Sequence, residues 1–197
     1  QHNISDTDFA VGLVGLLIPW KGQEIFIDAA KQLKDKIPHL KMLIIGGTPD
    51  DCIPYETMLK SRVLEEGLSD HVIFTGHVTN MPSVYSGLDI VVSASTDPEP
   101  LGTVVIESMA MGRPLIGPDH GGAAEMLEHG KTGLLFKAKN AKRLAEAIEN
   151  FYLSIEKREQ FGQAARVHAL KKFAVKTHVI QIQSVYVKLL TEKKRLT

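Results

Sequence analysis

Short runs of apolar, often β-branched residues alternate along this chain with longer segments of helical periodicity. Most of these short runs are apolar at every position, which is the pattern of parallel strands that are buried on both faces. Strands and helices that alternate in this way indicate a parallel sheet with helices on both faces. We therefore expect an α/β fold, a doubly wound Rossmann-like sheet of about six strands. The expected strands are residues 10–17, 41–46, 72–75, 90–94, 114–117 and 133–136.

Helical periodicity fills the intervals between the expected strands and continues after the last of them. The alternation stops near residue 137, and two helices then follow with no strand between them. We expect one domain over residues 1–197, with a core over about residues 9–152 and C-terminal helices over residues 153–192. The expected helices are residues 23–36, 55–66, 81–87, 103–111, 123–128, 141–151, 155–173 and 175–192.

The composition limits the classes of function. Lysine plus arginine and aspartate plus glutamate are equal at 23 each, so the chain lacks the positive charge of a nucleic-acid-binding domain. No apolar run is long enough to span a bilayer, and the first residues do not have the pattern of a secretory signal. A single cysteine, Cys52, is typical of a reducing compartment. We expect a cytoplasmic protein without a nucleic-acid partner.

Glycines cluster where the expected strands end. In an open parallel sheet, ligands bind beyond the carboxyl ends of the strands, where the loops gather. Each of these glycines by itself is explained by turn formation. Together they predict a binding edge. They are Gly15, Gly46, Gly47, Gly76, Gly102, Gly121 and Gly122.

The segment over residues 99–107 carries the strongest chemical signal. It places Glu99 before a turn and Glu107 within a helix that is apolar at nearly every position. A helix that is apolar nearly all round is expected to be buried, and a buried carboxylate needs a partner. We therefore expect Glu107 to be buried against a ligand, or else against a lysine or arginine. The alternative for Glu99 is an acidic side chain on an exposed loop.

The turn between the two glutamates suits a phosphate group. A helix N-terminus presents free backbone N–H groups and the positive end of the helix dipole, and Gly102 leaves room for close approach. At about 1.5 Å per residue, Glu107 lies roughly 7 Å along the helix from Gly102. That length is near the distance from a diphosphate to the hydroxyl pair of a ribose.

Residues 99–107 resemble the E-x7-E motif of the family 4 (glycosyl transferases group 1) retaining glycosyltransferases. Other segments resemble this family in its own order and spacing, and the match covers about residues 9–152. A sugar-nucleotide epimerase of similar architecture would carry different motifs. The further matching segments are VGLLIPWKGQ (14–23), VIFTGHV (72–78), LDIVVSAS (88–95), GRPLI (112–116), GGAAE (121–125) and GKTGLL (130–135).

The resemblance implies the C-terminal, donor-binding lobe of a two-lobed GT-B enzyme. Such an enzyme, here of hexosyltransferase type, moves a sugar from a UDP- or GDP-type donor to an acceptor. The N-terminal lobe, which binds the carbohydrate or lipid-linked acceptor and supplies a catalytic histidine, is expected to be absent from this chain. The isolated lobe would then bind donors without turnover. Membrane association stays open, with a peripheral position at the inner membrane as one possibility for the longer protein. We expect His39, His71, His120 and His129 to lie at the surface rather than to act as bases.

The resemblance also implies roles for individual residues. Glu107 would accept hydrogen bonds from the ribose hydroxyls, and Glu99 from a hydroxyl of the donor sugar. Lys21, beside Gly15, would stabilise the diphosphate as the sugar departs. No cofactor or metal is expected, because Lys21 and the helix dipole neutralise the phosphates and no cluster has metal-ligand spacing. Backbone N–H groups of Leu101, Gly102 and Thr103 would hold the distal phosphate, with His77 and Val78 beside the base.

Leu16 departs from the family pattern, which places an arginine after the first glycine and beside the diphosphate. Arginine offers phosphate a fixed positive fork, and leucine offers none. The loss of one such donor lowers a rate by roughly 10²–10³. Arg113 is not expected to replace it, because it lies at the other end of its helix. Two interpretations therefore stay open: a transferase donor domain, or a nucleotide-sugar-binding lobe without turnover.

Overall fold

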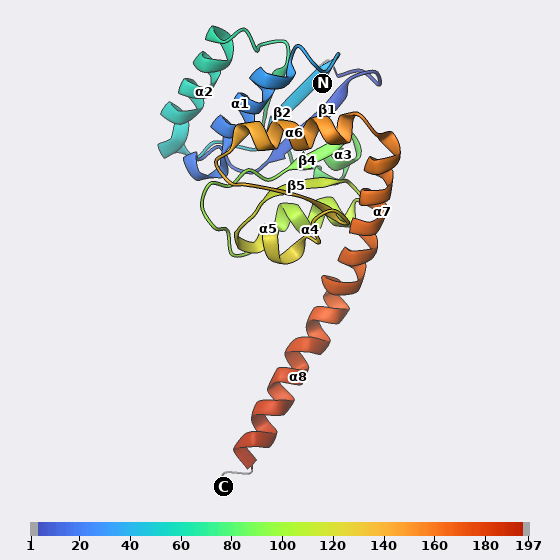
Figure 1. Cartoon of the computed structure of the whole chain (residues 1–197). Coiled ribbons are helices and arrows are strands. Elements are labelled where there is room, and N and C mark those ends of the chain that lie inside the picture. The colour runs from blue at the N-terminus through green and yellow to red at the C-terminus, as the bar shows by residue number, and fades with distance from the viewer. Residues whose placement is uncertain (1–3, 195–197) are drawn as a thin grey trace.

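Six parallel strands form a single sheet in the computed structural model, which describes residues 4–194 and the side chains of residues 4–191 (Figure 1). The strand order is β3-β2-β1-β4-β5-β6. The chain first builds outward from β1 to β3 and then returns to β4 beside β1, so the order reverses between β1 and β4. The strands are β1 (Phe9–Val14), β2 (Leu40–Ile45), β3 (Val72–Gly76), β4 (Ile90–Val92), β5 (Leu115–Pro118) and β6 (Gly133–Phe136).

Helices cover both faces of this sheet. Each face of the sheet has a core cluster of its own, into which the helices of that face pack. On the first face lie α1 (Gln23–Leu33), α2 (Ile53–Glu65) and α6 (Ala141–Tyr152). On the second lie α3 (Met81–Ser86), α4 (Thr103–Ala110), α5 (Gly121–Met126) and much of α7 (Ile155–Lys172).

The continuous apolar runs of the sequence arise because each strand is buried on both sides. In β2, Met42 and Ile44 pack into the cluster under α1, whereas Leu43 and Ile45 pack into the cluster under α3. Successive side chains of a strand point to opposite faces, so both sets must be apolar when both faces are covered. The predicted Rossmann-like parallel sheet of about six strands is confirmed.

The ends of several elements differ from the sequence-based expectation. The first strand ends at Val14 rather than at residue 17, because the chain leaves the sheet for a 3-10 turn over Pro19–Lys21. A second such turn, Asp50–Cys52, leads directly into α2, which therefore begins at Ile53. Helix α5 begins at Gly121, two residues earlier than expected.

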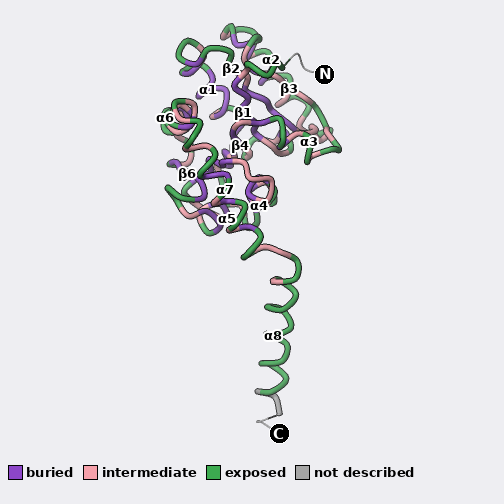
Figure 2. The backbone as a smooth tube through the Cα atoms, turned by 90° about the vertical axis from the view of Figure 1, so that its right-hand side faces the viewer, coloured by how far each residue is buried: buried purple, intermediate pink, exposed green. Residues whose placement is uncertain are grey.

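The two C-terminal helices differ in their packing. Helix α7 buries Phe161 in the cluster of the first face and Ala165 and Ala169 in that of the second, so the core extends beyond residue 152. Helix α8 (Val175–Lys194) runs away from the sheet, and nearly all of its described side chains are exposed (Figures 1 and 2). Within residues 4–194, no helix has both the length and the apolarity that crossing a membrane requires.

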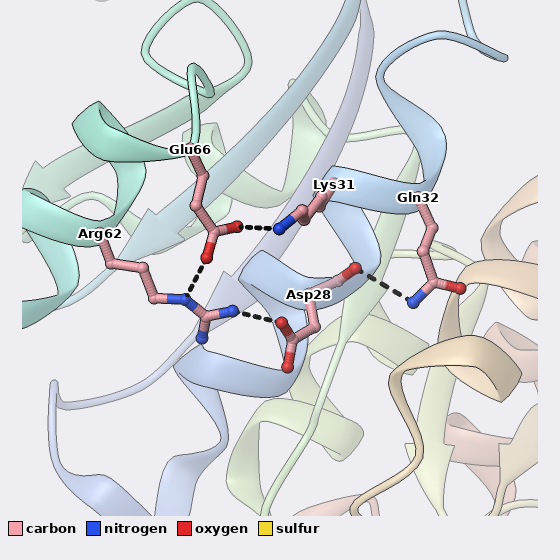
Figure 3. A network of polar contacts seen from close by, with 5 residues as sticks. All are labelled: Asp28, Lys31, Gln32, Arg62 and Glu66. Carbon is pink, nitrogen blue, oxygen red and sulfur yellow. Dashed lines mark hydrogen bonds and ion pairs between the residues drawn. The ribbon is translucent and has the colours of Figure 1, made fainter.

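A polar network on the surface joins α2 to α1 (Figure 3). Arg62 contacts Asp28 through one guanidinium nitrogen and donates from Nε to Glu66 Oε1 at 2.8 Å. Lys31 Nζ lies 3.4 Å from Glu66 Oε2, and Gln32 Nε2 donates to the Asp28 carbonyl at 3.1 Å. The Arg62 guanidinium lowers the pKa of the Glu66 carboxyl. The network thus connects α2 to α1 in addition to the apolar cluster that the two helices share.

Gly162 lies where α7 crosses the turn after α4. A Cβ at this position would be 2.1 Å from the carbonyl oxygen of Gly112, which is too close for non-bonded atoms. Alanine is otherwise about 1 kcal/mol more favourable than glycine inside a helix. We expect Gly162→Ala to lower the free energy of unfolding by about 1–3 kcal/mol, because α7 must move away from α4.

Urea denaturation measures this effect. The control is Gln163→Ala, at an exposed position one residue later, which should change the free energy of unfolding by less than about 0.5 kcal/mol. A Gly162→Ala variant as stable as this control would contradict the predicted close packing of α7 on α4.

Candidate functional site

Lys21 and Glu99 meet where the strand order reverses. Lys21 lies in the loop after β1 and Glu99 in the loop after the neighbouring β4. Lys21 Nζ donates to Glu99 Oε1 at 2.5 Å, and the two side chains are only 16% and 21% exposed. Ser95 Oγ donates to Glu99 Oε2 at 3.1 Å, and Lys21 Nζ lies 4.4 Å from the centre of the Trp20 ring. Glu99 is therefore a paired, partly buried carboxylate rather than an exposed loop acid.

Backbone contacts hold the Glu99 loop against its neighbours. The Gly122 N–H donates to the Glu99 carbonyl at 2.7 Å, and the Thr96 N–H donates to the Trp20 carbonyl at 2.8 Å. Gly121 has φ +59°, and a Cβ there would be 2.7 Å from Glu99 N. The loops after β1, β4 and β5 therefore interlock at the carboxyl edge, which is where open α/β sheets bind ligands.

The start of α4 offers backbone donors beside this pair. Among the described residues, the N–H groups of Leu101, Gly102 and Thr103 donate no hydrogen bond. Leu101 and Thr103 are exposed, whereas Gly102 is buried. Free N–H groups and the helix dipole together favour an anion at such a position. The three residues predicted to contact a phosphate thus lie at one accessible helix end.

Glu107 is exposed, so the prediction that it is buried is wrong. Helix α4 packs on the sheet through Val105, Ser108 and Met109, and Glu107 lies on its open side. The Tyr85 hydroxyl donates to Glu107 Oε2 at 2.7 Å. The internal partner is thus a buried phenol rather than a lysine or arginine, and solvent or a ligand still reaches the carboxylate.

The remaining predicted binding residues lie along the same edge. The Gly15 N–H donates to the Ile45 carbonyl at 2.9 Å, and a Cβ on Gly15 would be 3.6 Å from Lys21 Cδ. His77 and Val78 follow β3; His77 is exposed and lies beside Gly47 at the end of β2. The structure therefore brings Gly15, Lys21 and Glu99 together and places His77 and Val78 further along the edge.

Leu16, which departs from the family pattern, is 50% exposed in the loop after β1. Its carbonyl accepts a hydrogen bond from Gln23 Nε2 at 2.8 Å, which fixes the backbone of this loop. Arg113 lies beyond the other end of α4, where Nη2 donates to the Ser86 carbonyl at 2.7 Å. Arg113 is therefore occupied away from Leu16 and does not replace the missing cation.

The sequence interpretation did not include three residues that the structure places at this site. The sequence indicates a role for Ser95 only weakly, through its position after β4 and four residues before Glu99. Nothing in the sequence indicates the contact of Tyr85 with Glu107, because the two residues are 22 positions apart. His120 was expected at the surface, but both of its ring nitrogens are buried and have no hydrogen-bond partner in the described part of the chain.

Comparison with known proteins identifies the family. The family model described as "Glycosyl transferases group 1" matches residues 1–168. The chain belongs to this family. The predicted membership and the Rossmann-like lobe of a GT-B enzyme are thereby confirmed.

Solved structures with this fold include Anabaena HepE in complex with UDP. It has a TM-score of 0.87 and 31% sequence identity, over 92% of this chain and 49% of that one. HepE in complex with UDP-glucose gives a TM-score of 0.86. The C-terminal domain of the group 1 family protein LpcC from Francisella tularensis has a TM-score of 0.79 and 26% identity, over 85% of this chain and 87% of that domain. This chain thus matches the C-terminal domain of such proteins.

Among curated relatives, one from Mycobacterium tuberculosis is a GDP-mannose-dependent alpha-(1-6)-phosphatidylinositol monomannoside mannosyltransferase. It is 30% identical over 158 residues, which are 76% of this chain and 40% of the relative. The chain spans about half the length of the curated relatives that it matches, for example 50% of the lipopolysaccharide core mannosyltransferase LpsB of Rhizobium meliloti.

The burial of the Tyr85 phenol, together with its hydrogen bond to Glu107, predicts a stability that depends on pH. Burial, followed by the hydrogen bond to Glu107, raises the pKa of the Tyr85 phenol far above its usual value. In the unfolded chain this phenol ionises near pH 10. The unfolded state therefore loses its proton first, and the contribution of Tyr85 to the free energy of unfolding falls as the pH rises above about 10.

We expect Tyr85→Phe to destabilise the protein by about 1 kcal/mol at pH 8, where the hydrogen bond is intact. Because phenylalanine cannot ionise, the difference from the wild type should shrink from about pH 10 upward. Urea denaturation at pH 8 and at pH 11 measures both values. Tyr186→Phe, at an exposed position on α8, is the control and should be neutral at either pH. A difference that stays constant with pH would argue against the raised pKa of Tyr85.

Proposed function

We propose that this chain binds the nucleotide-sugar donor of a retaining glycosyltransferase of hexosyltransferase type. The observation that carries the proposal is the Lys21–Glu99 pair at the reversal of strand order, directly before the free N–H groups at the start of α4. The names of its relatives support a UDP- or GDP-type donor, since HepE is known in complex with UDP-glucose and the mycobacterial relative is GDP-mannose-dependent.

Lys21 and the start of α4 are suited to a diphosphate. An ammonium group has three N–H donors, so Lys21 can contact Glu99 and a phosphate oxygen at the same time. When the bond between sugar and phosphate breaks, negative charge grows on the leaving diphosphate, and a fixed cation stabilises it. In the proposed mechanism these groups neutralise the diphosphate, so that neither a metal nor a cofactor is required.

The two glutamates are suited to the two hydroxyl-bearing parts of the donor. Glu99 has one oxygen on Lys21 and the other on Ser95, and each oxygen keeps a further lone pair that can accept from a sugar hydroxyl. Glu107 is exposed and one of its oxygens is free of Tyr85, so it can accept from the ribose. His77 and Val78 would then flank the base.

Binding of the acceptor is proposed for the longer protein and not for this domain alone. Since the relatives are about twice as long, we propose that an N-terminal lobe binds a carbohydrate or lipid-linked acceptor and that this domain alone binds donors without turnover. We also propose that the protein acts on the cytoplasmic side, where nucleotide sugars are available.

Calorimetric titration of the chain with UDP, GDP and ADP tests the proposal. We expect saturable binding of UDP or GDP, weakened about 10- to 100-fold by Glu107→Gln, because the neutral amide has only one acceptor oxygen for the ribose hydroxyls in place of a charged pair. Binding should be the same with EDTA as without it. The control is Glu65→Gln, at an exposed position at the end of α2, which should bind like the wild type. Equal binding by Glu107→Gln and wild type would contradict the assigned role of Glu107.

Leu16 favours a second candidate, a lobe that binds nucleotide sugars without turnover even in the longer protein. If Leu16 lies beside the diphosphate, Leu16→Arg adds a cation there and should strengthen UDP or GDP binding about tenfold. Leu16→Gln, which adds polarity but no charge, should change the affinity little. An arginine variant that binds no better than the glutamine variant would place the diphosphate away from Leu16 and remove the reason for this second candidate.

A further inference from the structure

His120 is a polar side chain at the site with no partner of its own. It lies between β5 and α5, and although the residue is partly exposed, both ring nitrogens are buried. Neither nitrogen has a hydrogen-bond partner among the described residues. A buried polar group left without a partner costs about 1–3 kcal/mol, so such groups in folded proteins are nearly always paired with protein or with ordered water.

The cavity beside His120 connects it to Glu99. This cavity, here called the Glu99 cavity, has a volume of about 10 Å³. A polar cavity of about this size holds a single water molecule. The polar side chains that line it are Ser93, Ser95, Glu99 and His120. The other residues that line it are Gly102, Val105, Pro118 and Ala123.

We propose that His120 is a positioning residue for Glu99, linked to its carboxylate by one water molecule in the Glu99 cavity. The inference rests on the proposed function, in which Glu99 accepts a hydrogen bond from the donor sugar. The imidazole N–H donates to the water, and the water donates to Glu99 Oε2. The hydroxyl of Ser93, which also lines the cavity, offers the water a further polar contact. Bridging water molecules of this kind are nearly as favourable as direct hydrogen bonds.

The role predicted for His120 concerns the sugar and not the nucleotide. Lys21 holds Oε1 of Glu99, while Ser95 and the water hold Oε2, so the carboxylate keeps one orientation. Without His120 the carboxylate loses one of these contacts and reorients. In the proposed function, the nucleotide part of the donor contacts Glu107, Lys21 and the start of α4. Lys21 and Glu107 do not line the Glu99 cavity, and the start of α4 lines it only through Gly102 and Val105. The loss should therefore weaken the sugar contact alone.

Titration of the chain with UDP and UDP-glucose, and with GDP and GDP-mannose, tests the inference. The quantity compared is the ratio of the affinity for the sugar nucleotide to that for the nucleotide alone. We expect His120→Leu, which keeps a side chain of similar size, to lower this ratio about three- to tenfold with the nucleotide affinity unchanged. His120→Gln retains a polar end and should restore most of the ratio. Thermal unfolding of each variant confirms that it is folded.

Glu99→Gln, titrated in parallel, separates the two proposals. If Glu99→Gln lowers the ratio and His120→Leu does not, the role of His120 is refuted while the proposed function stands. If neither the wild type nor any variant binds a nucleotide, the proposed function is refuted, and this inference with it. The same holds if Glu99→Gln leaves the ratio unchanged, because Glu99 then has no contact with the sugar. If His120→Leu weakens nucleotide and sugar nucleotide equally, His120 has only a structural role.

Two further results would support the link. The double variant His120→Leu with Glu99→Gln should have the same ratio as Glu99→Gln alone, since both changes act through one carboxylate. A crystal structure of the chain should contain an ordered water within hydrogen-bond distance of both His120 and Glu99. A structure in which the His120 ring nitrogens contact other groups instead would overturn the inference.

Discussion

The ion pair between Lys21 and Glu99 is the contact on which the site depends. Its partners are 78 residues apart, and they meet because β1 and β4 are neighbours at the point where the strand order reverses. Both side chains are largely buried, so each needs the other to compensate its charge. The surrounding contacts from Ser95 and the Gly122 N–H hold the acidic partner in place. A site of this kind can exist only where the sheet topology brings two loop ends together.

Much of the fold could be predicted because a strand that is buried on both faces of the sheet must be apolar at nearly every position, and such runs are visible in the sequence. The expected strand over residues 41–46 is observed as Leu40–Ile45, where every position except Lys41 contributes to one core cluster or the other. The end of β1 could not be predicted in the same way. Leu16 continues the apolar run, yet it is 50% exposed in a loop, and hydrophobicity alone does not separate these two environments.

The identity of the site residues could be predicted from the sequence, but their exposure and their hydrogen-bond partners could not. The motif of the family is visible in a single sequence. It consists of the spacing between Glu99 and Glu107 and of the turn that contains Lys21. The exposure of Glu107 could not be predicted, because an apolar helix does not reveal which of its sides packs on the sheet. The partners of Tyr85 and the burial of the His120 nitrogens depend on contacts between distant segments, and periodicity contains no information about those.

Helix α7 has a consequence for any attempt to shorten or recombine this domain. Because Phe161 packs on one face of the sheet and Ala165 and Ala169 on the other, a boundary at residue 152 would uncover apolar surface on both sides. Helix α8, by contrast, covers almost none of this core. A shortened domain should therefore extend at least through Phe173, which packs against the cluster of the second face. A chimaera with a relative should exchange α7 together with the sheet and keep its junction directly before α8.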